Sequence, residues 1–146
     1  KNWRIYQRNL HARHSKTYHK FIMLRAFVSL TTRRFATKAR EVFGTNFDEV
    51  IKTSENVPVV VDFYADWCGP CRQLTPRLES LAEEFNGKVD LVKVNVDAEE
   101  NVQLCAQFRI SAVPAVFALR NGKVQDKFTG SLPEQQLRDW LQKLTQ

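Results

Sequence analysis

Hydrophobic positions between residues 57 and 96 change from a strand-like to a helix-like spacing and back. Residues 57–65 are mostly β-branched or aromatic, which predicts a strand buried on both faces. The helical spacing that follows places apolar side chains at Leu74, Leu78, Leu81, Ala82 and Phe85. Asn86-Gly87 is expected to end this helix, and residues 89–96 predict a second buried strand. A strand, a helix and a strand in this order form a βαβ unit with parallel strands.

Shorter elements surround this unit, two with the pattern of helices and two with that of strands. In chain order they are 46–52, 99–108, 115–120 and 123–129. Asn121-Gly122 separates the two strands and is typical of a tight antiparallel hairpin. A last helix has an apolar stripe, and Ser131 with Glu134 predicts a capping box at its start. The pattern as a whole predicts an α/β domain whose mixed β-sheet is flanked by helices.

Charge divides the chain of 146 residues into two unlike parts. Residues 1–40 hold 11 Lys and Arg and no acid, whereas residues 41–146 hold 11 basic and 16 acidic residues, a charge of −5. The pI of 9.4 therefore does not describe one folded surface, and it does not predict nucleic-acid binding by the domain. We expect residues 1–40 to lie outside the fold and 41–146 to form a single domain.

The basic segment contains a pattern typical of a mitochondrial transit peptide. Residues 23–35 lack acids and place apolar and Arg side chains on opposite faces of a helix. Arg33-Arg34-Phe35 followed by Ala36 resembles a matrix-processing signal, which predicts a mature start near Ala36 and a location in the mitochondrial matrix. Residues 1–22 are interpreted as sequence upstream of this peptide. The alternative is a basic arm that binds nucleic acid or a membrane surface.

The positions of histidine and cysteine exclude several kinds of chemistry. All three His, at positions 11, 14 and 19, lie in the basic segment, so the domain has no imidazole for a Ser-His-Asp triad or a Cys-His pair. Three Cys are one too few for a closed zinc site. No apolar run approaches the roughly 18 residues of a membrane span. We therefore expect no bound metal, no membrane partner and no nucleic-acid partner.

Trp67-Cys68-Gly69-Pro70-Cys71 occupies the junction between the first buried strand and the long helix. Cysteines three positions apart in a first helical turn are close enough to form a disulfide. Cys68 lies at the helix N-terminus, which lowers the pKa of a thiol, and Cys71 is expected to be less exposed. This asymmetry predicts an attacking thiolate and a resolving thiol. Half of a zinc site, or two core cysteines, are the alternatives.

The residues over 61–71, Val-Asp-Phe-Tyr-Ala-Asp-Trp-Cys-Gly-Pro-Cys, resemble the active-site signature of the thioredoxin family. The resemblance covers about 41–146, and with the transit peptide it is similar to the mitochondrial type. It implies the thioredoxin fold, with a parallel βαβ unit and an antiparallel ββα unit in one mixed sheet. It also implies a monomeric protein-disulfide reductase, an electron carrier of cell redox homeostasis.

The resemblance further implies how electrons reach and leave the protein. No cofactor is bound, and electrons come from NADPH through the FAD of thioredoxin reductase. The implied substrates are peroxiredoxins, methionine sulfoxide reductases and other disulfide-bearing proteins.

Several residues acquire expected roles from the resemblance. Asp62 accepts the proton of Cys71, and Lys93 pairs with Asp62. The Val113–Pro114 bond is cis, and the backbone of Val113 pairs with an extended substrate. The substrate-binding residues implied are Trp67, Gly69, Pro70, Val113, Pro114 and Gly130. The residues alone leave three alternatives open. Asp62 could be a core acid whose hydrogen bonds are satisfied, Lys93 a surface residue, and the bond before Pro114 trans.

Two departures and two rival functions accompany this interpretation. Tyr64 stands where many thioredoxins carry Trp, and Cys105 is either a buried apolar filler or a regulatory thiol. One rival is a disulfide isomerase or oxidase, although those proteins usually carry Gly-His between the cysteines. The other is a binding scaffold that is indifferent to redox state.

Overall fold

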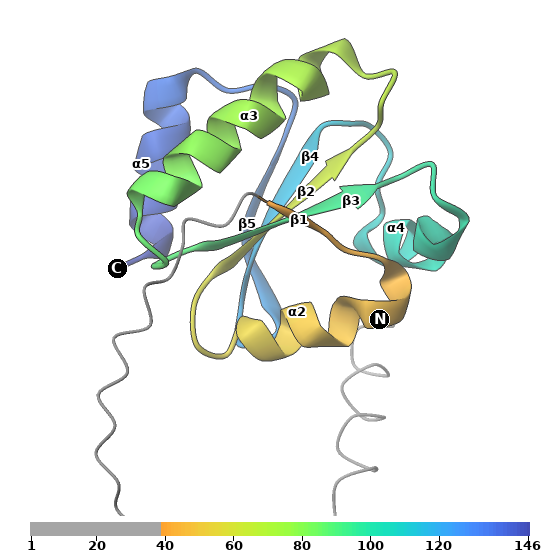
Figure 1. The fold of residues 1–146 in the computed structure, drawn as a ribbon, viewed down its shortest axis with the longest axis horizontal. Helices are drawn as coiled ribbons and strands as arrows, with labels where there is room; N and C mark the ends of the chain where they lie inside the picture. Colours follow the sequence, from red (N-terminus) through yellow and green to blue (C-terminus); the bar gives the residue numbers. More distant parts are fainter. Residues whose placement is uncertain (1–38) are drawn as a thin grey trace, which may run out of the picture. The chain divides into compact units, whose positions relative to one another are not determined.

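The computed structural model describes residues 39–146, which form one mixed sheet with helices on both faces (Figure 1). Its strands and helices, in chain order, are β1 (Arg40–Glu41), η1 (Gly44–Asn46), α2 (Phe47–Thr53), β2 (Val59–Tyr64), α3 (Gly69–Glu84), β3 (Asp90–Asn95), η2 (Glu99–Asn101), α4 (Val102–Phe108), β4 (Ala115–Arg120), β5 (Lys123–Thr129) and α5 (Glu134–Leu144). None of these helices is long and apolar enough to cross a bilayer.

The five strands lie in the order β1-β3-β2-β4-β5. β3 runs parallel to β2, whereas β4 is antiparallel to both β2 and β5. Asn121 and Gly122 turn the β4–β5 hairpin with φ angles of 52° and 68°, the left-handed backbone that this residue pair adopts readily. The predicted mixed sheet, with its parallel and antiparallel units, is confirmed.

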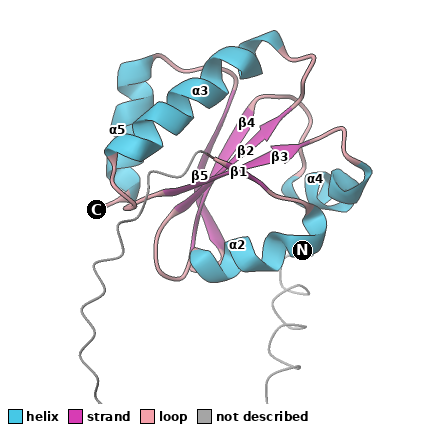
Figure 2. Ribbon diagram, viewed as in Figure 1, coloured by secondary structure: helices cyan, strands magenta, loops and turns pink. Residues whose placement is uncertain are grey.

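The two faces of the sheet receive alternate side chains of β2. α3 and α5 cover one face, and α2 and α4 lie against the other (Figure 2). Val60 packs with leucines of α3 and α5, while Phe63 contacts Phe108 and Phe117 at ring-centroid distances of 5.2 and 5.6 Å. Because side chains alternate along a strand, Asp62 points toward α3 together with Val60.

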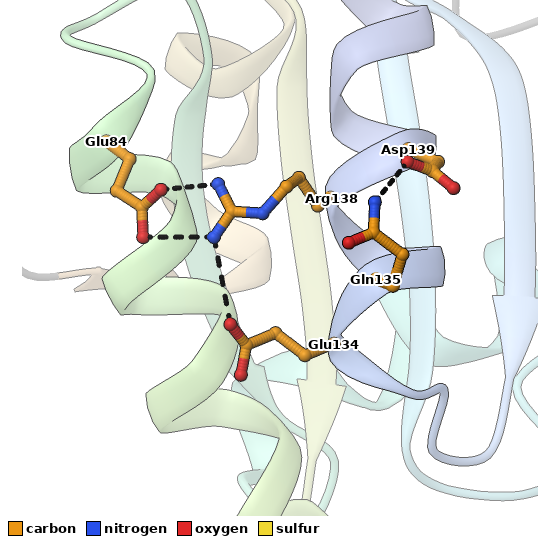
Figure 3. A network of polar contacts seen from close by, with 5 residues as sticks. All are labelled: Glu84, Glu134, Gln135, Arg138 and Asp139. Carbon is orange, nitrogen blue, oxygen red and sulfur yellow. Dashed lines mark hydrogen bonds and ion pairs between the residues drawn. The ribbon is translucent and has the colours of Figure 1, made fainter.

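Polar contacts tie α5 to α3 at the solvent edge of their interface (Figure 3). Arg138 binds Glu84 of α3 through both of its terminal nitrogens and lies 3.7 Å from Glu134. Gln135 donates to Asp139 at 2.8 Å within α5. Exposed ion pairs contribute at most about 1 kcal/mol. The two helices are therefore held mainly by their buried leucines: Leu74, Leu78, Leu81, Leu137 and Leu141.

The structure differs from the sequence-based expectations at two helix and strand ends. β1 was not predicted, and because it begins at Arg40, with Ala39 buried beside it, the expected domain boundary at 41 falls inside this strand. The capping box at Ser131 is wrong, since α5 begins at Glu134 with Pro133 as its N-cap and no side-chain cap bond. Glu134 is therefore the first helical residue rather than the third, and it cannot reach back as a capping box requires.

Candidate active site

Cys68 and Cys71 form a disulfide at the beginning of α3, with a Cα–Cα distance of 5.3 Å. The predicted pairing of these two residues is confirmed, and neither sulfur is free to ligate zinc in this state. Cys68 is the N-cap of α3, and its Sγ accepts the backbone N–H of Cys71 at 3.2 Å. Both residues are buried, 3% and 2% exposed, so the expected difference in their exposure is small in this oxidised form.

Local sequence explains why α3 begins at the cysteines. β2 ends at Tyr64, and Pro70 lies in the first helical turn, where its fixed φ and missing N–H are tolerated. The Cys71 N–H, which points at Cys68 Sγ, and the helix dipole both favour negative charge on that sulfur. The position of Cys68 thus favours a thiolate once the disulfide is opened.

Trp67 stands beside the disulfide with 69% of its surface exposed. Its indole Nε1 donates to Asp97 Oδ2 at 2.9 Å, and the N–H of Asp97 donates to Asn95 Oδ1 at 3.0 Å. Asp97 was not among the predicted site residues. A signal for it existed, because β2 and β3 are parallel, and residues that follow their carboxyl ends meet at one edge of the sheet.

The loop before β4 comes to the disulfide from a distant part of the chain. Val113 packs with Cys68 and Cys71, and the Val113–Pro114 peptide bond is cis, as expected. Gly130 adjoins this loop, since its N–H donates to the Pro114 carbonyl at 2.8 Å. Gly130 has a φ of +86°, and the space around its Cα is open. Val113 therefore packs against the cluster that holds both cysteines, and Gly130 is joined to this loop through the Pro114 carbonyl.

Asp62 is fully buried beneath α3. Its Oδ2 accepts the Thr75 hydroxyl at 2.6 Å, whereas Oδ1 has no hydrogen-bond partner among the described residues. Burial raises the pKa of Asp62 from 3.8 to about 6, a rise limited by the Thr75 hydrogen bond and the Lys93 charge and favoured by the Glu79 charge. A carboxyl with this pKa can both take up and release a proton near neutral pH.

Lys93 lies directly beside Asp62 in the parallel ladder between β2 and β3. Its ammonium is 3.7 Å from Glu79 Oε1 and 5.6 Å from the centre of the Tyr64 ring. The ion pair that residues 39–146 provide for Lys93 is thus with Glu79, while its charge also acts on Asp62. Thr75 and Glu79 were missed at the sequence level, although they follow Cys71 at the helical spacing of four and eight.

Tyr64 packs against the cluster of Ala65, Cys68 and Cys71, whereas Cys105 lies on α4. The Tyr64 hydroxyl donates to Glu41 Oε1 at 2.9 Å and so joins β2 to β1; burial, then the Glu41 contact, raises the pKa of Tyr64 to about 12. Cys105 is an unbonded, half-buried thiol on α4, and burial raises its pKa. A raised pKa suits a packing residue better than a reactive thiol.

The geometry alone describes a redox site. A disulfide lies at the N-terminus of α3, the preceding residue is an exposed Trp, and a buried carboxyl of raised pKa is hydrogen-bonded to the same helix through Thr75. In the part of the chain that the structure describes, no group of three or more His, Cys, Asp or Glu is arranged to hold a metal ion. Reversible opening of the disulfide by an attacking thiolate needs only these groups.

A family profile and several individual proteins are similar to this chain in sequence. The thioredoxin family profile matches residues 38–143. "Thioredoxin, mitochondrial" of Rattus norvegicus is 45% identical over 114 residues, which are 78% of this chain and 67% of that protein. The Haemophilus influenzae protein named thioredoxin is 41% identical over 96 residues, 66% of this chain and 87% of its own length.

Solved structures agree with the sequence matches. Thioredoxin f from spinach chloroplast, short form, superposes with a TM-score of 0.67 at 31% identity, covering 75% of this chain and 95% of its own. Thioredoxin family proteins are protein-disulfide oxidoreductases that carry no cofactor of their own. Fold, disulfide and similarity agree, and the chain belongs to the thioredoxin family.

Proposed function

We propose that the protein reduces disulfides of other proteins through Cys68 and Cys71. Cys68 as thiolate attacks one sulfur of the substrate disulfide and forms a mixed disulfide, releasing the other substrate sulfur as a thiolate. Cys71 then attacks Cys68, loses its proton to Asp62, and expels the second substrate sulfur. The observation that carries this proposal is the Cys68–Cys71 disulfide at the α3 N-terminus. Lys93 supports the role of Asp62 because its charge stabilises the carboxylate.

The substrate is an extended segment that carries a disulfide. Trp67, Gly69 and Pro70 would contact it on one side of Cys68. Val113, Pro114 and Gly130 would contact it on the other, where the backbone of Val113 offers hydrogen bonds to an added strand. The exposure of Trp67 and the open space at Gly130 support this surface.

Electrons would be returned to the site by a thioredoxin reductase that draws them from NADPH through FAD. Peroxiredoxins and methionine sulfoxide reductases would be among the substrates. Membership in a family that acts on disulfide-bearing proteins and depends on a reductase supports both assignments.

Residues 23–35 would direct the protein to the mitochondrial matrix, and the domain that follows them would begin near Ala39. Relatives named as mitochondrial thioredoxins support this location, whereas residues 1–38 lie outside the described structure. Mass spectrometry of the protein recovered from isolated mitochondria is expected to find an N-terminus near Ala36. An N-terminus that retains residues 23–35 would contradict the transit-peptide assignment.

The reduction potential of the Cys68–Cys71 pair is the direct test of the proposed direction of reaction. Equilibration of the full chain with thiol buffers is expected to give a value near about −270 mV, that of a protein reductant. A value near about −180 mV would instead indicate an oxidant or isomerase. Failure of the pair to re-form a disulfide would favour the redox-indifferent scaffold.

A further inference from the structure

Thr75 makes a hydrogen bond that is unusual for a threonine inside a helix. Such a hydroxyl commonly donates to the carbonyl four residues earlier. Thr53 in α2 does so, with its Oγ1 2.9 Å from the Glu49 carbonyl oxygen. Thr75 Oγ1 instead donates across the helix–sheet interface to Asp62 Oδ2, at the shorter distance of 2.6 Å. The Thr75 hydroxyl thus donates its hydrogen bond to the Asp62 carboxylate rather than to a carbonyl of its own helix.

This bond makes the two oxygens of Asp62 unequal. Oδ2 is occupied by Thr75, while Oδ1 is buried and has no hydrogen-bond partner within residues 39–146. A buried acceptor without a partner is costly, and it gains most from receiving a proton. Cys71 and Thr75 are one helical turn apart on α3, so the resolving thiol and the hydroxyl share one face of the helix.

We propose that Thr75 is a positioning residue for the exchange reaction, which holds Asp62 by Oδ2 and leaves Oδ1 as the atom that receives the proton of Cys71. The inference rests on the proposed function and specifies one step of it. The S–H bond of Cys71 breaks, its proton goes to Asp62 Oδ1, and the sulfur bonds to Cys68 as the substrate sulfur leaves with its electron pair. No further oxidant or reductant is needed.

The other groups that face Asp62 do not duplicate the hydroxyl. Lys93 approaches from β3, but its ammonium is 3.7 Å from Glu79, whose negative charge acts on Asp62 in the opposite direction. On the β4 side the residue opposite Asp62 is Val116, which is apolar. Among the described residues, the hydrogen bond donated to the Asp62 carboxylate is therefore that of Thr75.

The test compares the full-length protein with Thr75→Val, which keeps the branched shape and removes the donor, and with Thr75→Ser, which restores it. Thr53→Val is the matched control, because it removes a helical hydroxyl remote from Asp62. In the oxidised protein the cysteines do not titrate, so the carboxyl carbon signal of Asp62 in NMR reports its protonation directly. Its titration midpoint should rise by about one pH unit in Thr75→Val and return in Thr75→Ser.

Kinetics of the resolving step provide the second readout. For a base whose pKa rises by about one unit from about 6, the resolution rate in a single turnover should fall about fivefold at pH 6 and change little at pH 8. An unchanged midpoint in Thr75→Val would overturn the inference. So would equal slowing at both pH values, which indicates a merely structural role, or failure of Thr75→Ser to restore the profile.

A parallel measurement on Asp62→Asn separates this inference from the proposed function. If Asp62→Asn slows resolution but Thr75→Val does not change the profile, the proposed function stands and only the role of Thr75 is overturned. If Asp62→Asn resolves at the wild-type rate at every pH, proton transfer to Asp62 is overturned for both.

Discussion

Replacing Cys71 with serine is expected to abolish turnover and to leave the substrate bound covalently to Cys68. Cys68 keeps its place at the α3 N-terminus, so the first attack proceeds. A serine hydroxyl does not ionise near neutral pH and cannot displace the substrate sulfur from Cys68. Steady-state disulfide reduction should fall by at least about a thousandfold, on the scale of other losses of a covalent catalytic group.

Non-reducing electrophoresis and intact-mass spectrometry would detect this adduct as one substrate joined to one protein. Cys68→Ser should form no adduct, and it separates the attacking from the resolving sulfur. Cys105→Ser is the matched control, since Cys105 is an unbonded thiol on α4 whose pKa is raised by burial, and it should turn over normally. A Cys71→Ser protein that continued to turn over would contradict the two-cysteine mechanism.

Replacing Asp62 with asparagine is expected to stabilise the fold at neutral pH while slowing resolution. The pKa of Asp62 rises from 3.8 to about 6 on folding, chiefly through burial. The folded state therefore holds this proton more tightly than the unfolded state does. The stability that protonation of Asp62 contributes to the folded state is fully present below pH 3.8 and is lost as the pH rises through about 6. At pH 7 the charged carboxylate then costs up to about 3 kcal/mol, which Asn removes.

Urea unfolding of Asp62→Asn and wild type between pH 4 and pH 8 measures this difference. The stabilisation should be small near pH 4, increase up to about pH 6 and remain constant above it. Asp139→Asn is the control, because Asp139 is exposed on α5 and its replacement should change the free energy of unfolding by less than about 0.5 kcal/mol. A difference that did not depend on pH would show that Asp62 is ionised equally in both states.

A gain in stability with a loss of rate would have a simple physical meaning. The same desolvation that makes the Asp62 carboxylate costly also gives it a pKa near neutrality, where it can exchange a proton. If this position were selected for stability alone, an apolar residue would be expected between Val61 and Phe63.

Local pattern was sufficient wherever the deciding interactions lie within a few residues. The Asn121-Gly122 turn follows from backbone conformational preference, and the apolar spacing of α3 follows from helical geometry. The spacing of Cys68 and Cys71 allows a disulfide because both belong to one helical turn. The mixed sheet could be predicted from the order of these elements and the length of their connections.

Elements that depend on distant partners could not be predicted in this way. β1 is two residues long, too short to show a period, and it exists because β3 offers it a parallel edge. The observed start of α5 differs from the predicted one because Pro133, rather than Ser131, is the N-cap residue. Asp97 is a site residue only because its carboxylate meets the Trp67 indole, 30 positions away.

The buried acid shows where the boundary between sequence and tertiary structure lies. An Asp between two apolar strand residues already indicates a carboxyl that needs a partner or a task, because burying a charge is costly in any fold. Its partners lie on a helix and on a neighbouring strand. The Thr75 hydroxyl of α3 binds one oxygen, and the ammonium of Lys93 on β3 pairs with Glu79 while its charge also acts on Asp62. Only packing α3 onto β2 and β3 sets those distances. Residue type and spacing therefore identified the sulfur chemistry, and three-dimensional contact determined how its proton is handled.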